Sequence, residues 1–156
     1  MKMKKLLSFT LCVALLITFS VEAAAVSENT GDIISEQTVT EDGLTIIDKV
    51  IQYPVQTRSS ARTRTADHYK AIYSGDTLIA EITFRATFSY DGSSVFVVYK
   101  SVIQTDTYSG WTYTQQSFTS SGGTVTLEGK LRKLLVMNIP FTMGLTCDVN
   151  GNITAI

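Results

Sequence analysis

The sequence predicts an all-β protein whose globular part is an antiparallel β-sandwich. From residue 78 to residue 90, apolar and polar side chains alternate with a period of two, as they do in a strand that buries one face. Turn-forming groups such as Asp91-Gly92-Ser93 and the Ser-Ser-Gly-Gly run at 120–123 then recur at intervals of about 8–12 residues, which is typical of sandwiches and barrels.

The first 25 residues have the pattern of a secretory signal peptide. Three lysines lie among the first five residues, and an uncharged, mostly apolar run of sixteen residues follows from 6 to 21. That run is shorter than the roughly 20 residues a helix needs to cross a bilayer, and small residues from Ala23 to Ala25 follow it. We expect cleavage after Ala25 or Ala23, with an uncleaved signal anchor as the alternative. The protein is then secreted and extracellular, and it meets a membrane only during export.

Cleavage would change both the cysteine count and the charge. It removes Cys12 and leaves Cys147 as the only cysteine, so the mature chain can form no internal disulfide. The remaining 131 residues carry ten basic and thirteen acidic side chains with no basic stripe. This length predicts one domain, and the charge argues against nucleic acid as a partner.

Charge and composition divide the mature chain into three parts. Residues 26–55 are acidic and form either an ordered extension or a pro-region, and the apolar stretch from Leu44 to Tyr53 favours the extension. Residues 56–65 are rich in Arg, Ser and Thr without a hydrophobic period, which predicts a linker. Residues 66–156 form the predicted β-sandwich domain.

Six or seven strands are expected in this domain, the seventh being a short strand after Asn150-Gly151. Asn150-Gly151 is the residue pair favoured in type I′ hairpin turns, and the reversal between 133 and 138 has no turn former. The expected strands are 69–73, 78–90, 95–105, 111–118, 125–131, 141–149 and 152–156.

Trp111 and Cys147 suggest a core that is immunoglobulin-like in outline. Immunoglobulin domains pair two cysteines and place a Tyr two residues before the second one. Here the mature chain has one cysteine, and Leu145 occupies the tyrosine position. We therefore expect the two-layer outline without true membership.

Several segments resemble small secreted β-rich proteins of Gram-positive bacteria, a domain family of unknown function. The similar segments are Tyr-Lys-Ala-Ile-Tyr-Ser-Gly-Asp, Phe-Ser-Tyr-Asp-Gly-Ser-Ser, Trp111 and Leu-Thr-Cys-Asp-Val-Asn-Gly-Asn, and together they span residues 69–154. The resemblance implies export and a single strand-rich domain, and it implies no chemistry.

Nucleophilic catalysis and metal binding have few candidate residues. His68 is the only histidine, no Gly-x-Ser-x-Gly elbow is present, and we expect His68 to be a solvated residue at the start of a strand. Cys147 shares the alternation of an apolar strand, which predicts an inert core thiol. One Cys and one His are too few for zinc, and the Asp148–Asn152 stretch has its glycine at the wrong position for a calcium loop. We predict no metal and no cofactor.

Paired carboxylates offer one enzymatic alternative. Glu81 and Glu128 fall on different predicted strands, and Asp106 lies at the end of a third. Two carboxyl groups at a suitable separation can hydrolyse a glycosidic bond. A small secreted carboxylate-based hydrolase is therefore one alternative function. A bacteriocin-like secreted product is another, suggested by the size, the export and the acidic segment.

One aromatic cluster is a candidate binding site. Tyr108, Trp111 and Tyr113 surround Gly110 at the junction between a turn and a strand. Such rings combine a flat apolar face with a polar edge and can stack on a sugar or capture a peptide, although Trp111 can equally belong to the core. The sequence thus favours a non-catalytic domain with a binding or structural role, whose partner is carbohydrate or protein at the cell surface.

Overall fold

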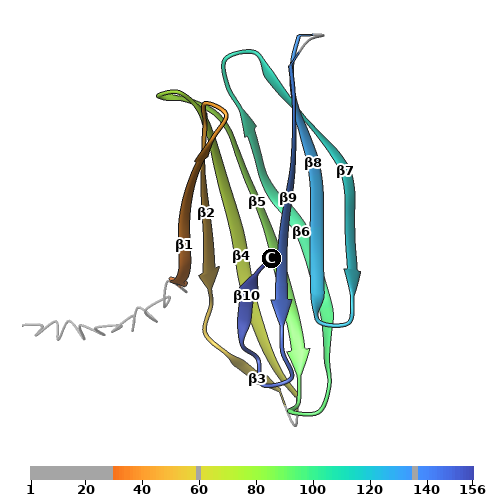
Figure 1. Cartoon of the computed structure of the whole chain (residues 1–156). Helices are drawn as coiled ribbons and strands as arrows, with labels where there is room; N and C mark the ends of the chain where they lie inside the picture. Colours follow the sequence, from red (N-terminus) through yellow and green to blue (C-terminus); the bar gives the residue numbers. More distant parts are fainter. Residues whose placement is uncertain (1–29, 59–60, 135–136) are drawn as a thin grey trace, which may run out of the picture.

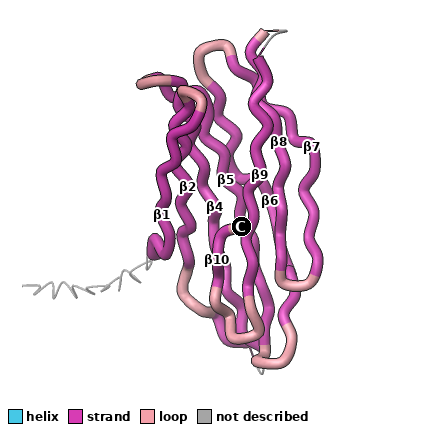
Figure 2. The backbone as a smooth tube through the Cα atoms, in the orientation of Figure 1, coloured by secondary structure: helices cyan, strands magenta, loops and turns pink. Residues whose placement is uncertain are grey.

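The fold of the chain is an antiparallel β-sandwich, as the sequence predicts. A computed structural model describes residues 30–58, 61–134 and 137–156, so the predicted signal peptide and its cleavage site at Ala25 lie outside the described residues. Strands and short loops make up the whole described part (Figure 2). They form two sheets that pack face to face around a shared core.

The larger sheet, sheet A, contains the first six strands. Its order is β1-β2-β4-β5-β6, and β3 pairs with β4 beyond the end of β2 (Figure 1). All these pairs are antiparallel. The strands are β1 (Asp32–Glu41), β2 (Leu44–Gln52), β3 (Gln56–Arg58), β4 (Ala61–Ser74), β5 (Thr77–Tyr90) and β6 (Val95–Thr107).

The smaller sheet, sheet B, contains the last four strands in the order β10-β9-β8-β7. They are β7 (Trp111–Ser121), β8 (Thr124–Lys133), β9 (Met137–Cys147) and β10 (Ile153–Ala155). The chain passes from sheet A to sheet B through residues 108–110, so each sheet is a meander. The immunoglobulin outline therefore extends to the two layers but not to Greek-key connections.

The core lies between the inner faces of the two sheets. On β5, Ile82, Phe84, Ala86 and Phe88 are fully buried, as the alternation predicts. Sheet B supplies apolar side chains at alternate positions of β8 and β9, with Gly129 at one of these positions on β8. The fully buried members from sheet B are Val125, Leu127, Leu131, Met143 and Leu145.

Both edges of sheet A carry features that discourage pairing with another chain. Every residue of β1 is exposed, and its pairing with β2 contains a bulge between Ile33 and Ser35. Strand β6 has two register shifts, and its Lys100 points inward to donate a 2.7 Å hydrogen bond to the Phe118 carbonyl of sheet B. Bulges and inward-pointing charges both disfavour edge-to-edge association.

The segment predicted to be a linker is mostly strand. Residues 56–58 form β3, and residues 61–65 begin β4, where they pair with β5. The composition was misleading because backbone pairing, with β4 for residues 56–58 and with β5 for residues 62–65, makes these small polar side chains part of a sheet. Strand β2 in turn lies between β1 and β4, which places the described part of the acidic segment within sheet A.

The hairpin predicted at Asn150-Gly151 exists with a different turn. Only Gly151 has a positive φ, of 86°, and its N–H bonds to the Asp148 carbonyl at 3.0 Å. The five residues between β9 and β10 therefore turn with one glycine in the left-handed region, not as a type I′ turn. The ring of Tyr90 lies against the α-carbon of Gly151 and leaves no room for a Cβ.

We predict that Gly151→Ala lowers the free energy of unfolding by about 2–4 kcal/mol, because it adds left-handed strain to overpacking against Tyr90. Gly43→Ala is the matched control, since Gly43 also has a positive φ, of 75°, but open space around it. It should cost about 1–2 kcal/mol. Equal losses in urea unfolding would contradict the role of the Tyr90 contact.

Candidate functional site

The outer face of sheet A, turned away from sheet B, gathers most of the tyrosines. Because Phe84 on β5 points into the core, Glu81, Arg85 and their outward neighbours point the other way. Of the seven tyrosines in the chain, five lie on this outer side. They are Tyr53, Tyr69, Tyr73, Tyr99 and Tyr108, and we call this surface the tyrosine face.

One end of the tyrosine face centres on Glu81. Tyr69 and Tyr108 each donate a 2.7 Å hydrogen bond to this carboxylate, one to each oxygen. Asp106 is the direct cross-strand partner of Glu81 and accepts a 2.8 Å bond from Gln104. Two of the carboxylates suggested by the sequence therefore lie side by side, and this end of the face is acidic.

The other end centres on a charged array of three residues. Asp67 is 4% exposed, and its two oxygens accept bonds of 2.7 and 2.8 Å from Nε and Nη2 of Arg85. Tyr53 completes the array: its hydroxyl donates to Asp67 at 2.7 Å and accepts from Arg85 Nη2 at 2.9 Å. Bidentate Arg–carboxylate pairs are strong and geometrically specific, so the array is held rigidly on the sheet.

The phenols in both clusters remain protonated donors. Burial and the hydrogen bond to Asp67 raise the pKa of Tyr53, and burial together with Glu81 raises the pKa of Tyr69 well above its ordinary value. The hydrogen bond to Glu81 raises the pKa of Tyr108 to about 12. Burial disfavours the charged phenolate of Tyr53 and Tyr69, and in all three tyrosines a phenolate beside a carboxylate is unfavourable.

The three aromatic residues predicted as a platform are separated by the fold. Tyr108 is 39% exposed and turns to Glu81 on the tyrosine face, whereas Trp111 is 5% exposed and belongs to the core between the sheets. Tyr113 is half-buried and stacks on Phe141 with ring centroids 6.0 Å apart. Trp111 and Tyr108 therefore are not exposed side by side.

The hydroxyl of Tyr113 is buried without a hydrogen-bond partner among the described residues. Its ring is accommodated by Gly129, where an added Cβ would collide with both Phe141 and Tyr113. A buried hydroxyl without a partner costs free energy because it has lost its bonds to water.

We predict that Tyr113→Phe raises the free energy of unfolding by about 1 kcal/mol, because it removes the unpaired hydroxyl and keeps the stack with Phe141. Tyr69→Phe is the matched control. It loses the bond to Glu81 and should lower stability by about 1 kcal/mol. A destabilised Tyr113→Phe protein in urea unfolding would show that the hydroxyl is satisfied.

His68 is buried in the middle of β4, so the prediction of a solvated residue at a strand start is wrong. Its side chain is 2% exposed, with Nε2 3.2 Å from Asp48 Oδ1 and Nδ1 3.1 Å from the Gly144 carbonyl oxygen of sheet B. Each ring nitrogen therefore faces one oxygen acceptor, the first on strand β2 and the second on sheet B. Lys70 also contacts the Asp48 carboxylate, at 2.9 Å.

This arrangement does not form a nucleophilic triad or a Cys–His pair. Asp67, the sequence neighbour of His68, points to the opposite face of the sheet. Both nitrogens of His68 contact groups other than Cys147. Cys147 is 2% exposed, and burial beside Asp148 raises the pKa of its thiol to about 11, which keeps it protonated.

We predict that Asp48→Asn reduces the loss in free energy of unfolding that accompanies a fall in pH on the acidic side. Burial alone would raise the pKa of Asp48, but the bonds from His68 and Lys70 outweigh it and hold the pKa below 3.8. The stabilisation is complete above the unfolded value of 3.8 and is lost as pH falls through the lower folded value. Urea unfolding of both proteins between pH 5 and pH 2.5 tests this, and parallel profiles would contradict it.

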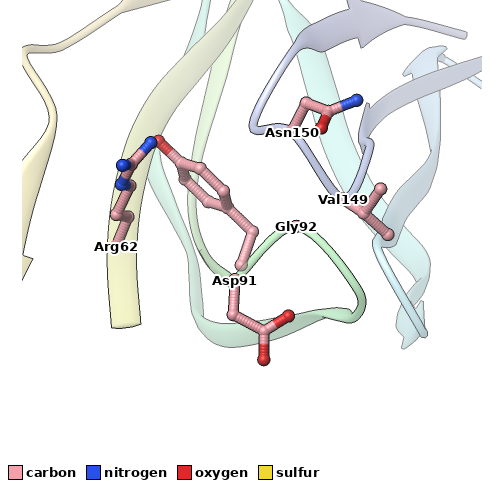
Figure 3. A pocket seen from close by; sticks show the side chains of 6 residues that line it. Arg62, Asp91, Gly92, Val149 and Asn150 are labelled. Carbon is pink, nitrogen blue, oxygen red and sulfur yellow. The ribbon is translucent and has the colours of Figure 1, made fainter. Parts of the chain in front are cut away.

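A pocket of about 330 Å³ lies at the end of the sandwich where the loop between β5 and β6 meets the loop between β9 and β10. Figure 3 shows Arg62 on one side of it and Val149 with Asn150 on the other. The carboxylate of Asp148 accepts the backbone N–H groups of Asn150 and Asn152, and this lowers its pKa. Asp148 therefore stabilises the turn. Across the described ranges, no group of three or more His, Cys, Asp or Glu side chains is placed to hold a metal ion.

The sequence interpretation missed Tyr53, Asp67 and Arg85. Glu81 and Arg85 do occupy polar positions of the predicted strand 78–90, which was a signal that charged groups line the outer face. The position of Tyr53 opposite them depends on how β2 pairs with β4, and single-strand periodicity does not contain that information. In the part of the chain that is described, no helix is long and apolar enough to span a membrane.

Comparison with known proteins found no matching family model, no matching curated protein and no matching solved structure. The similarity to small secreted proteins of Gram-positive bacteria therefore stays a prediction.

Proposed function

We propose that the chain is a secreted, non-catalytic binding domain whose ligand contacts the tyrosine face. The observation that carries the proposal is the gathering of five tyrosines and two preformed charged clusters on one exposed sheet face. Tyrosine is enriched in binding surfaces because its ring offers apolar area and its hydroxyl offers a hydrogen bond.

The same face shows why a structural role alone is a weaker explanation. Tyr99 and Tyr108 are 51% and 39% exposed, so neither ring is needed to fill the core. Asp67, Arg85 and Tyr53 form a rigid array on the outer side of the sheet, where the cost of ordering the side chains is met before a ligand arrives. Preorganised polar groups beside exposed rings are what a binding surface requires.

A carboxylate hydrolase is the second candidate, and the pairing of Glu81 with Asp106 favours it. Directly opposed residues in antiparallel strands have Cβ atoms about 4.5–5.5 Å apart, which brings two carboxyl groups close to the spacing of retaining glycosidases. However, both oxygens of Glu81 already accept hydrogen bonds from the phenolic hydroxyls of Tyr69 and Tyr108. A carboxylate in that role is poorly arranged to donate a proton to a leaving group, so we prefer binding.

We predict that purified protein, residues 26–156, binds members of a glycan and peptide panel without converting them. The double variant Tyr99→Ala/Tyr108→Ala should weaken binding at least tenfold, because truncation of central aromatic side chains commonly costs more than 1 kcal/mol. Gln115→Ala, on the exposed surface of sheet B, is the control and should bind like the wild type.

Two results would count against the proposal. Undiminished binding by the double variant would move the ligand away from the tyrosine face. Product formation that disappears in Glu81→Gln or Asp106→Asn would establish the hydrolase instead.

A further inference from the structure

The array of Tyr53, Asp67 and Arg85 borders a pocket on the tyrosine face. The pocket has a volume of about 550 Å³. Strand β4 contributes Thr65, β5 contributes Arg85 and Thr87, and β6 contributes Tyr99. The segment that follows β2 supplies the remaining wall with Tyr53, Pro54 and Gln56.

The polar wall of this pocket is built before any ligand binds. Nε and Nη2 of Arg85 are held by the buried Asp67, and Nη2 also contacts Tyr53. Within the described residues, Nη1 of Arg85 has no hydrogen-bond partner, so its two N–H groups remain available to a ligand. The threonines Thr65 and Thr87 hydrogen-bond to each other at 2.9 Å on the pocket floor.

Two further residues give the pocket apolar surface. Tyr99 on β6 is the cross-strand partner of Thr87. It is 51% exposed, so its ring does not fill the core. Pro54 adds a second apolar surface next to Tyr53. A ligand here would meet the aromatic ring of Tyr99 from β6 and the N–H donors of Arg85 from β5.

The charges argue for an uncharged ligand. The positive charge of Arg85 is compensated by Asp67 at 2.7 Å, so an anion would gain little from it. Glu81 and Asp106 lie on the same face and would repel an anion approaching from that end. A molecule with a flat apolar face and neutral hydroxyl groups at its edge matches both walls.

We propose that this pocket binds one ring of an uncharged carbohydrate, with the ring stacked on Tyr99 and a hydroxyl accepting a hydrogen bond from Nη1 of Arg85. The inference rests on the proposed function, since it names the ligand class and the position on the tyrosine face. The acidic end around Glu81 then lies along the face, where it can contact the next unit of a longer glycan.

Isothermal titration with neutral oligosaccharides, matched uronic-acid oligosaccharides and peptides tests the inference. We expect Tyr99→Ala to weaken binding of neutral oligosaccharides at least tenfold, and Arg85→Lys, which keeps the charge but loses the guanidinium fork, to weaken it severalfold. Phe96→Ala is the matched control: Phe96 is equally exposed on β6, at 51%, but does not line the pocket. It should bind within twofold of the wild type.

The possible failures are distinguishable. Binding lost in Tyr108→Ala but unchanged in Tyr99→Ala would overturn the pocket and leave the tyrosine face as the binding surface. Tighter Tyr99-dependent binding of acidic sugars or peptides would overturn the assignment of an uncharged carbohydrate. Unchanged binding in both variants would overturn the proposed function itself. Thermal unfolding of each variant checks that the fold is intact.

Discussion

The alternation of β5 is the constraint on which the rest of the structure depends. Its inward side chains, Ile82, Phe84 and Ala86, are fully buried and form the centre of the core. Glu81 and Arg85 occupy alternate positions of the same strand and point outward. A shift of one residue in the register would exchange the two faces and bury both charges. The packing of the core and the composition of the tyrosine face are therefore set by the same register.

Polar contacts between the two sheets add to the apolar packing of the core. The buried Cys147 in this core is a free thiol. Arg64 donates to the Gly151 carbonyl at 2.9 Å, His68 faces the Gly144 carbonyl at 3.1 Å, and Lys100 donates to the Phe118 carbonyl at 2.7 Å. Each link joins a basic side chain of sheet A to a backbone oxygen of sheet B or its adjoining loop. Because such bonds are directional, they help to fix the position of one sheet on the other where hydrophobic contact alone would permit sliding.

The tyrosine face combines two different electrostatic environments along one sheet. At the Glu81 end the tyrosines donate to a carboxylate that has no cationic partner within the described part of the chain, so this end stays negative. At the Arg85 end the charges cancel within the array. The face therefore offers hydrogen-bond donors and aromatic area without a strong positive field, which suits uncharged ligands better than anionic ones.

By itself the sequence determined the two-layer all-β fold and most strands from residue 69 onward, because one-sided burial imposes a period of two that can be read locally. It did not reveal β1, whose residues are all exposed, or the strand character of residues 56–58 and 61–65. It also grouped Tyr108, Trp111 and Tyr113 because they are neighbours in the chain. Only the tertiary structure decided that Trp111 is core and that Tyr53, Arg85 and Tyr99 share a pocket. The physical reason is that strand pairing and sheet packing join residues far apart in the chain, and local periodicity contains no record of those contacts.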